Sequence, residues 1–174
     1  MRDAQQRLER FDGLHMTPLD RLHMTTLIAG SADELSEDQL QQMIKTASGL
    51  LAETPPITVV IGGILYHPEA IMLAVRSAQG LAAVRDAAQA ATQAVTDRLL
   101  EASARSRWVP HITICYSTAD QATGPIADAL GTQQQEREIQ VSAVSLVVQH
   151  GPERLWDWRI IGTVRLRPAA KRQP

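Results

Sequence analysis

Two copies of a histidine–x–threonine triplet are the residues of this chain whose types and spacing best suit chemistry. His23 and Thr25 form the first copy, and His111 and Thr113 form the second. Each copy lies in a run where apolar residues alternate with the motif residues, which is typical of a β-strand. Because side chains two residues apart project from the same face of a strand, each histidine shares a face with its threonine.

Two facing imidazoles can act together as a general base and a general acid. The free pKa of imidazole is near ~6.5, so one ring can be neutral while the other is charged. Cleavage of a phosphodiester or cyclic phosphate needs both roles, and each group typically contributes roughly 10²–10⁴-fold. A threonine hydroxyl can donate a hydrogen bond to a non-bridging phosphate oxygen. These residues therefore predict phosphate-ester chemistry that requires no metal.

One such triplet would carry little weight, because threonine is common in strands and an isolated histidine is more often structural. Here the order helix, motif strand, helix, strand, strand occurs twice, although the detailed sequence is not repeated. We therefore expect one domain over 1–166 with two lobes, roughly 1–78 and 79–166, and we allow strand exchange between them. The motif residues would face each other across a central cleft. The tail, 167–174, is expected to be disordered.

The elements that position the motifs follow from periodicity and from start and stop signals. Ser36, followed by acidic residues, is typical of a helix N-terminus. Helices are expected at 2–12, 36–51 and 81–104, with a short helix or loop at 122–131. Strands are expected at 21–29, 57–61, 70–75, 109–117, 138–148 and 155–166, with a loop at 13–20 and a turn at Gly62-Gly63.

Composition limits the class of protein. The chain has 174 residues, a formal net charge of -2, 44% hydrophobic residues and 3% aromatic residues. This charge argues against tight non-specific binding to nucleic acid but is compatible with a small phosphate ligand held by local donors. The single cysteine, Cys115, excludes an intrachain disulfide, and no apolar run suits a signal peptide or a membrane span. We expect a cytoplasmic protein without a membrane partner.

The two motif stretches, Leu22–Leu27 and Val109–Ile114, resemble those of the two-histidine (2H) phosphoesterase superfamily. Within it they are similar to the 2′-5′ RNA ligase / cyclic phosphodiesterase family. The closing strands, Val141–Gln149 and Trp156–Leu166, add support, and the resemblance covers about residues 10–166. It implies an α+β, bilobal, pseudo-symmetric fold in which two antiparallel sheets flank a central cleft, with the helices outside.

The resemblance also implies roles for the motif residues. His23 and His111 would be the acid/base pair, and Thr25 and Thr113 would bind phosphate. Members of the family act on 2′,3′-cyclic phosphates, 2′-5′ linkages or related cyclic nucleotides, so the implied partner is a nucleotide or an RNA-end phosphate, with no cofactor and no metal.

Two departures from the family pattern matter. Many members carry arginine three residues after the second motif threonine, where this chain has Tyr116. We expect Tyr116 to contact the substrate and another cation to neutralise the phosphate. The candidates for this cation are Arg105, Arg107 and Arg21, and we assign the role to Arg107. Without the family's arginine, RNA ligase activity is less expected. Members also usually begin with a strand, whereas this chain begins with the helix.

Other residues of chemical interest have simpler interpretations. His15 opens a third His-x-Thr triplet in the expected loop, and we interpret it as a near-repeat. His67 and His150 lie in expected turns and are interpreted as solvated. By parity Cys115 shares the motif face of its strand, with Tyr116 on the other face, and we expect the thiol to be buried and inert. Trp156 and Trp158 share a face and are expected to pack a sheet, although one could stack on a base.

The sequence thus predicts a metal-independent phosphodiesterase that acts on a 2′,3′-cyclic nucleotide, a 2′-5′ linkage or an RNA-end cyclic phosphate. One alternative is a catalytically idle nucleotide- or RNA-binding module that uses the same cleft. A third class is an interaction protein whose two histidines share no pocket.

Overall fold

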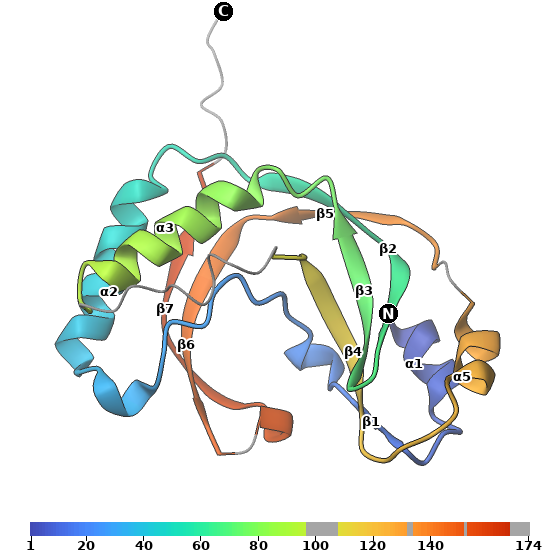
Figure 1. Cartoon of the computed structure of the whole chain (residues 1–174). Coiled ribbons are helices and arrows are strands. Elements are labelled where there is room, and N and C mark those ends of the chain that lie inside the picture. The colour runs from blue at the N-terminus through green and yellow to red at the C-terminus, as the bar shows by residue number, and fades with distance from the viewer. Residues whose placement is uncertain (97–107, 132–133, 152, 168–174) are drawn as a thin grey trace, which may run out of the picture. The chain divides into compact units, whose positions relative to one another are not determined.

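The computed structural model describes residues 1–96, 108–131, 134–151 and 153–167, and it has an α+β fold with two antiparallel sheets (Figure 1). This confirms the expected fold class. By internal contacts the chain divides into two compact units. Each unit combines segments from both halves of the sequence, so the units do not follow the division near residue 78. The first comprises Met1–Thr25, Val59–Arg76 and Val109–Ile139, and the second comprises Thr26–Thr58, Ser77–Trp108 and Gln140–Pro174.

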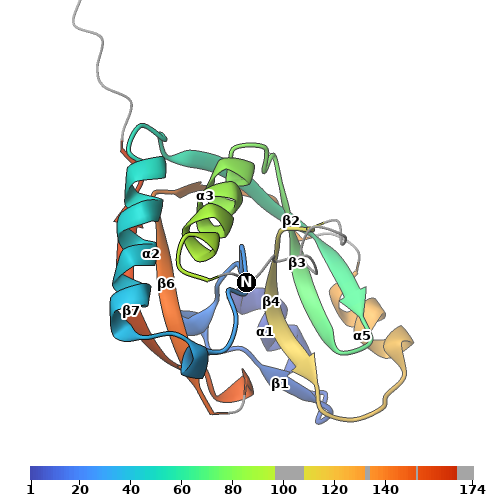
Figure 2. The same cartoon turned by 60° about the vertical axis from the view of Figure 1, so that its left-hand side comes forward.

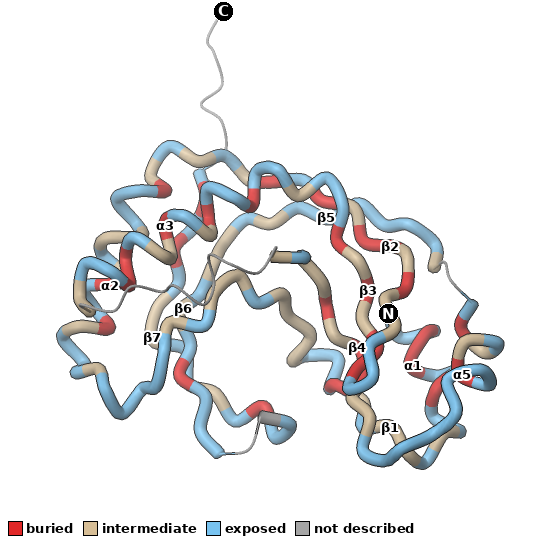
Figure 3. The backbone as a smooth tube through the Cα atoms, viewed as in Figure 1, coloured by how far each residue is buried: buried red, intermediate tan, exposed pale blue. Residues whose placement is uncertain are grey.

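The first unit is built on the five-stranded sheet. One face of its β3 strand is buried only at Ala70, whereas on the other face Ile71, Leu73 and Val75 are all buried. This apolar face is covered by α1 (Arg2–Leu8) and α5 (Thr123–Leu130), which lie on the same side of the sheet (Figures 1 and 3). The strands in spatial order are β1 (Leu14–Met16), β4 (His111–Ser117), β3 (Ala70–Arg76), β2 (Ile57–His67) and β5 (Arg137–Val141).

A buried amide ties α1 to the middle of this sheet. Gln5 is only 6% exposed, and its Nε2 donates to the carbonyl oxygens of Thr17 at 2.6 Å and Ile114 at 2.9 Å. The backbone N–H of Thr17 donates to the same Ile114 oxygen at 3.0 Å. Gln5 therefore fixes the helix against the point where β1 and β4 meet.

The second unit pairs β6 (Ala143–His150) with β7 (Asp157–Arg165) in an antiparallel ladder. Helices α2 (Glu37–Leu50) and α3 (Leu81–Gln93) contact each other, and α2 contacts β7 (Figure 2). A Cβ on Gly162 would lie 3.0 Å from Ile44, so glycine lets α2 approach β7 closely. Short 3₁₀ turns stand at Ala32–Glu34 and Glu153–Leu155. One cluster of its core consists of Leu40, Met43, Ala91 and Val148.

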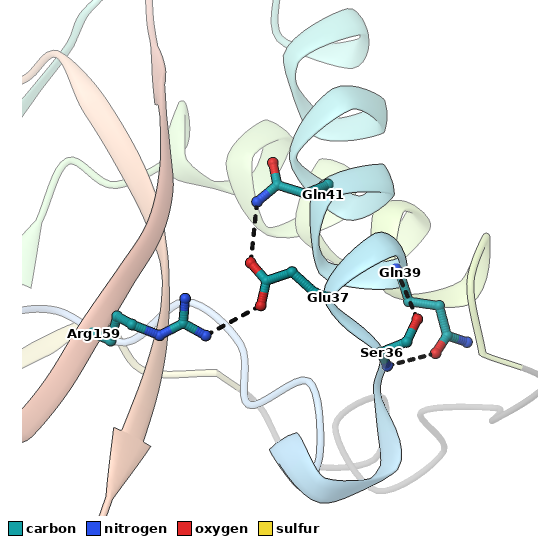
Figure 4. A network of polar contacts seen from close by, with 5 residues as sticks. All are labelled: Ser36, Glu37, Gln39, Gln41 and Arg159. Carbon is teal, nitrogen blue, oxygen red and sulfur yellow. Dashed lines mark hydrogen bonds and ion pairs between the residues drawn. The ribbon is translucent and has the colours of Figure 1, made fainter.

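The predicted N-terminus of α2 is confirmed in detail (Figure 4). Ser36 and Gln39 form a capping box, in which the Ser36 hydroxyl accepts from the Gln39 backbone and the Gln39 side chain accepts from the Ser36 backbone. Directly after the cap, Glu37 accepts from Arg159 at 3.2 Å and from Gln41. The hydrogen bond from Arg159 is the main reason that the pKa of the Glu37 carboxyl is lowered.

The strand predicted over 21–29 is wrong. A 3₁₀ turn at Leu19–Arg21 precedes it, and residues 22–30 belong to no helix or strand. The place beside β4 is taken instead by β1, which lies within the expected loop 13–20. Alternation of apolar and polar residues can indicate an extended backbone. An extended segment becomes a β-strand only where it can hydrogen-bond to the edge of a neighbouring strand.

Other boundaries also differ from expectation. Helix α1 ends at Leu8 rather than at residue 12, and the predicted strand 138–148 is divided between β5 and β6, which belong to different sheets. Gly62-Gly63 is no turn. Gly63 adopts a φ of 62° as the extra residue of a β-bulge, which lets β2 continue to His67. Helix α3 ends at Gln93, within the predicted helix 81–104, and residues 97–104 and the tail 168–174 lie outside the described residues.

We expect Gln5→Met to lower the free energy of unfolding by about 1–3 kcal/mol, because it leaves buried backbone oxygens without this donor. Urea unfolding followed by circular dichroism measures the change. Gln6→Met, one residue on and exposed, is the matched control and should stay within about 0.5 kcal/mol of wild type. Equal effects of the two substitutions would contradict the role given to the Gln5 amide.

Candidate active site

The second motif lies on β4 as predicted. In antiparallel pairs, directly opposite residues project from the same face. His111 is opposite Ala74 and Thr113 is opposite Met72, so both motif side chains are on the face of β3 that carries its even-numbered residues. That face is only partly buried, whereas Ile112 on the other face is 7% exposed. The motif histidine and threonine therefore lie on the sheet face opposite to α1 and α5.

A β-bulge at Ile114 changes which residues share this face. Thr113 pairs with Met72 and Cys115 pairs with Ile71, which leaves Ile114 as the extra residue. Because neighbouring residues of β3 point to opposite faces, Thr113 and Cys115 do so as well.

The bulge corrects two expectations about β4. Cys115 does not share the motif face: it is 0% exposed and packs in the core, where burial raises the pKa of its thiol to about 11. Tyr116 pairs with Ala70 and so joins His111 and Thr113 on the motif face. Tyr116, which we expected to contact the substrate, thus shares a face with the second motif.

The first motif occupies an irregular segment of the same compact unit. His23 is partly buried and Thr25 is exposed. The Nδ1 atom of His23 lies 2.7 Å from the carbonyl oxygen of Arg21. The Nδ1 atom of His111 lies 2.7 Å from the carbonyl oxygen of Val109. In both motifs the ring is thus held by the backbone oxygen two residues before it.

This shared bonding has a chemical consequence. A carbonyl oxygen can only accept, so Nδ1 must carry the proton in each ring. In the neutral imidazole, Nε2 is then the unprotonated nitrogen and can act as a base, and in the charged ring the same atom is an acid. Both motifs therefore have their histidine in the tautomer that suits proton transfer through Nε2.

The third His-x-Thr triplet is not in a loop but in β1. His15 is exposed and lies opposite Tyr116, which places it on the motif face. Thr17, by contrast, is 1% exposed, and its hydroxyl has no hydrogen-bond partner among the described residues. The triplet therefore cannot offer a substrate both of its side chains, in keeping with its interpretation as a near-repeat.

The remaining candidates lie elsewhere. His67 is the last residue of β2, where its Nδ1 accepts from the Glu69 backbone at 3.3 Å. It borders a cavity of about 560 Å³ whose other walls include Leu14, Tyr66 and Ser117. His150 ends β6 and is exposed. Trp156, the residue before β7, is buried, and Trp158 within β7 is partly buried. Arg105 and Arg107 lie outside the described residues.

One charged pair on the motif face was missed at the level of sequence. Arg76 ends β3 in the same phase as Ala74, and its guanidinium forms an ion pair with Glu136. Residue 76 directly follows the expected strand 70–75 and has the same even numbering as Ala74. The sequence could therefore have placed this arginine on the same face of the sheet. Nothing in the sequence indicated Glu136 as its partner, because that residue stands before a strand whose pairing had to be known first.

Two further features of the described residues concern metals and membranes. No three histidine, cysteine, aspartate or glutamate side chains converge there as a metal-binding group. None of the helices in that part of the chain combines the length and the apolar character needed to cross a bilayer.

Comparison with known proteins now identifies the family. A model of the 2′-5′ RNA ligase superfamily matches residues 2–153. The chain belongs to this superfamily. The crystal structure of TT0787 of Thermus thermophilus has a similar fold, with a TM-score of 0.73 and 18% sequence identity over 97% of this chain and 90% of that chain. No curated protein matches. The expected two-histidine phosphoesterase membership is confirmed, and a phosphoesterase- or ligase-type activity follows from it.

We expect the Cys115 thiol to resist alkylation in the folded protein. With its pKa at about 11, its thiolate at pH 8 is about 100-fold scarcer than in an unfolded chain. Iodoacetamide labelling followed by mass spectrometry, with and without urea, measures the difference, and the single cysteine makes the stoichiometry unambiguous. Equal labelling rates in the two conditions would contradict the burial of β4's inner face.

Proposed function

We propose that the protein is a metal-independent phosphodiesterase that opens a 2′,3′-cyclic phosphate or cleaves a 2′-5′ linkage of a nucleotide or RNA end. The observation that carries this proposal is the matched state of His23 and His111. Two histidines of one compact unit each direct Nδ1 to the carbonyl oxygen two residues before, in a chain of a superfamily with phosphoester chemistry.

In the proposed reaction, Nε2 of one histidine takes a proton from water as the water oxygen attacks phosphorus. The bond between phosphorus and one ribose oxygen breaks, and Nε2 of the second histidine gives that oxygen a proton. The product is a phosphomonoester, and the orientation of the substrate decides which histidine is the base. The carbonyl oxygens of Arg21 and Val109 stabilise the imidazolium that forms at each ring.

Charge on the phosphate oxygens is stabilised by hydrogen-bond donors. The hydroxyls of Thr25 and Thr113 would donate to the non-bridging oxygens. Tyr116 faces the same side as Thr113, and its ring and hydroxyl would contact the nucleoside of the substrate. Arg107, outside the described residues, is retained as a proposed phosphate contact.

We expect His23→Ala and His111→Ala each to lower kcat for a 2′,3′-cyclic nucleotide by roughly 10²–10⁴-fold, because each removes a proton-transfer group. Hydrolysis is followed by chromatography with EDTA present. His150→Ala, at an exposed position on β6, serves as the control and should match wild type.

Either of two results would overturn this assignment. The first is activity that survives both substitutions. The second is wild-type protein that binds the cyclic nucleotide without turning it over, which is the behaviour of a pure binding module.

We expect Thr113→Val, which keeps the shape of the side chain but removes the hydroxyl, to lower kcat by about 10²–10³-fold with a smaller change in KM. Thr113→Ser should recover most of the rate because it restores the donor. If the serine variant were as slow as the valine variant, restoring the hydroxyl would not restore the rate, and the donor role given to Thr113 would be contradicted.

A further inference from the structure

The ion pair of Arg76 and Glu136 lies on the motif face, in the same row of the sheet as His111. Across neighbouring strands, His111 is opposite Ala74 and Ala74 is opposite Gly62. A Cβ built on Gly62 would project to this face, 2.8 Å from the Cγ atom of Glu136 and 3.4 Å from the Nη2 atom of Arg76. The ion pair is therefore located above Gly62.

The surface between His111 and the ion pair is made of small side chains. Ala74 and Gly62 occupy the row, and the bulge at Gly63 adds no side chain. Gly62 cannot carry a Cβ without displacing Glu136, so glycine is what allows the pair to lie on the sheet. Two strand spacings separate His111 from Gly62, about 10 Å in total.

That separation decides what Arg76 can bind. A single phosphate bridged by two hydrogen bonds of about 2.9 Å each falls short of roughly 10 Å. These roughly 10 Å separate backbone positions, and Glu136 holds the guanidinium over Gly62, so its place on the sheet favours the phosphate of the adjoining nucleotide over the phosphate that meets His111. Arginine is well matched to this ligand because its planar donors bind two phosphate oxygens at once.

The present partner of Arg76 can be replaced. The Arg76 and Glu136 side chains are 51% and 55% exposed, and ion pairs this accessible to water are weak. A phosphate can therefore compete with the carboxylate, which in the absence of substrate holds the guanidinium in place over Gly62.

We propose that Arg76 binds the phosphate next to the reacting one, with Glu136 as its exchangeable partner. The preferred substrate is then an oligonucleotide that ends in a cyclic phosphate, rather than a cyclic mononucleotide. This inference rests on the proposed function, since it assumes that the reacting phosphate meets His111.

The test compares two substrates, uridine 2′,3′-cyclic phosphate and the dinucleotide UpU ending in the same cyclic phosphate. Arg76→Gln should raise KM about tenfold or more for the dinucleotide and less than about twofold for the mononucleotide. Glu136→Gln should lower the dinucleotide KM about two- to fivefold, because it removes the competing carboxylate. Changes of KM in opposite directions for substitutions at the two partners of one ion pair cannot arise from a loss of stability alone.

The control is Arg159→Gln, which breaks the similarly exposed pair with Glu37 on α2 and should leave both KM values unchanged. Thermal unfolding of all three variants checks that folding is preserved, and Arg76→Lys should have an intermediate KM because it keeps the charge but loses the planar donors. Equal effects of Arg76→Gln on the two substrates, or none on either, would overturn the inference.

A binding measurement separates this inference from the proposed catalysis. The affinities of wild type and Arg76→Gln for UpU ending in a 3′-phosphate and for uridine 3′-monophosphate are measured by calorimetry, which needs no turnover. Loss of affinity for the dinucleotide alone supports the inference even if wild type hydrolyses neither cyclic substrate. Affinities for the dinucleotide that are the same in both proteins reject it.

Discussion

The β-bulge at Ile114 is the constraint on which the rest of the candidate site depends. One extra residue in β4 directs His111, Thr113 and Tyr116 to the same face and Cys115 into the core. The buried Gln5 amide and the Thr17 N–H both donate to the carbonyl oxygen of this residue, so the bulge is held by α1 and by the residue that follows β1. A regular strand would have hidden the tyrosine and exposed the thiol, which gives a different surface from the same sequence. The arrangement follows the general use of bulges to re-aim side chains near functional sites.

The sequence predicted those parts of the molecule that depend on local signals. The Ser36–Gln39 capping box began α2 where expected, and the apolar alternation placed β3 and β4 within about two residues. It could not predict what depends on distant partners. The faces predicted for residues 109–117 assume that side chains alternate without interruption along the strand. Only the pairing register between β4 and β3 reveals the extra residue. The same limit explains why 21–29 was expected to be a strand: extended residues become one only when a neighbouring edge is free.

The two histidines illustrate a second kind of information that the sequence lacks. Their identity and spacing suggested acid/base chemistry, but the tautomer depends on where Nδ1 is directed. Both rings use a carbonyl oxygen two residues before them, one in an irregular segment and the other at the start of β4. The two motifs therefore share the same local hydrogen bond to the histidine ring, although only the second motif lies in a strand. Such a hydrogen bond needs only the backbone of the same segment. The tautomer that it imposes on each histidine therefore does not depend on whether the motif is paired in a sheet.

Net charge does not describe the local chemistry of the motif face. A formal charge of -2 argues against tight non-specific binding to nucleic acid, and charges more than about 8 Å apart are largely screened at physiological ionic strength. What a phosphate meets is the local set of donors. On this face that set includes a guanidinium whose nearest anion is half exposed and lies above a glycine. Placing a cation beside small residues, with a weakly held carboxylate as its partner, leaves it accessible to an incoming anion without leaving it unpaired beforehand. Under the proposed function, local geometry of this kind would let a mildly acidic chain bind the phosphates of a nucleotide or RNA end at one position, although its surface as a whole is not basic.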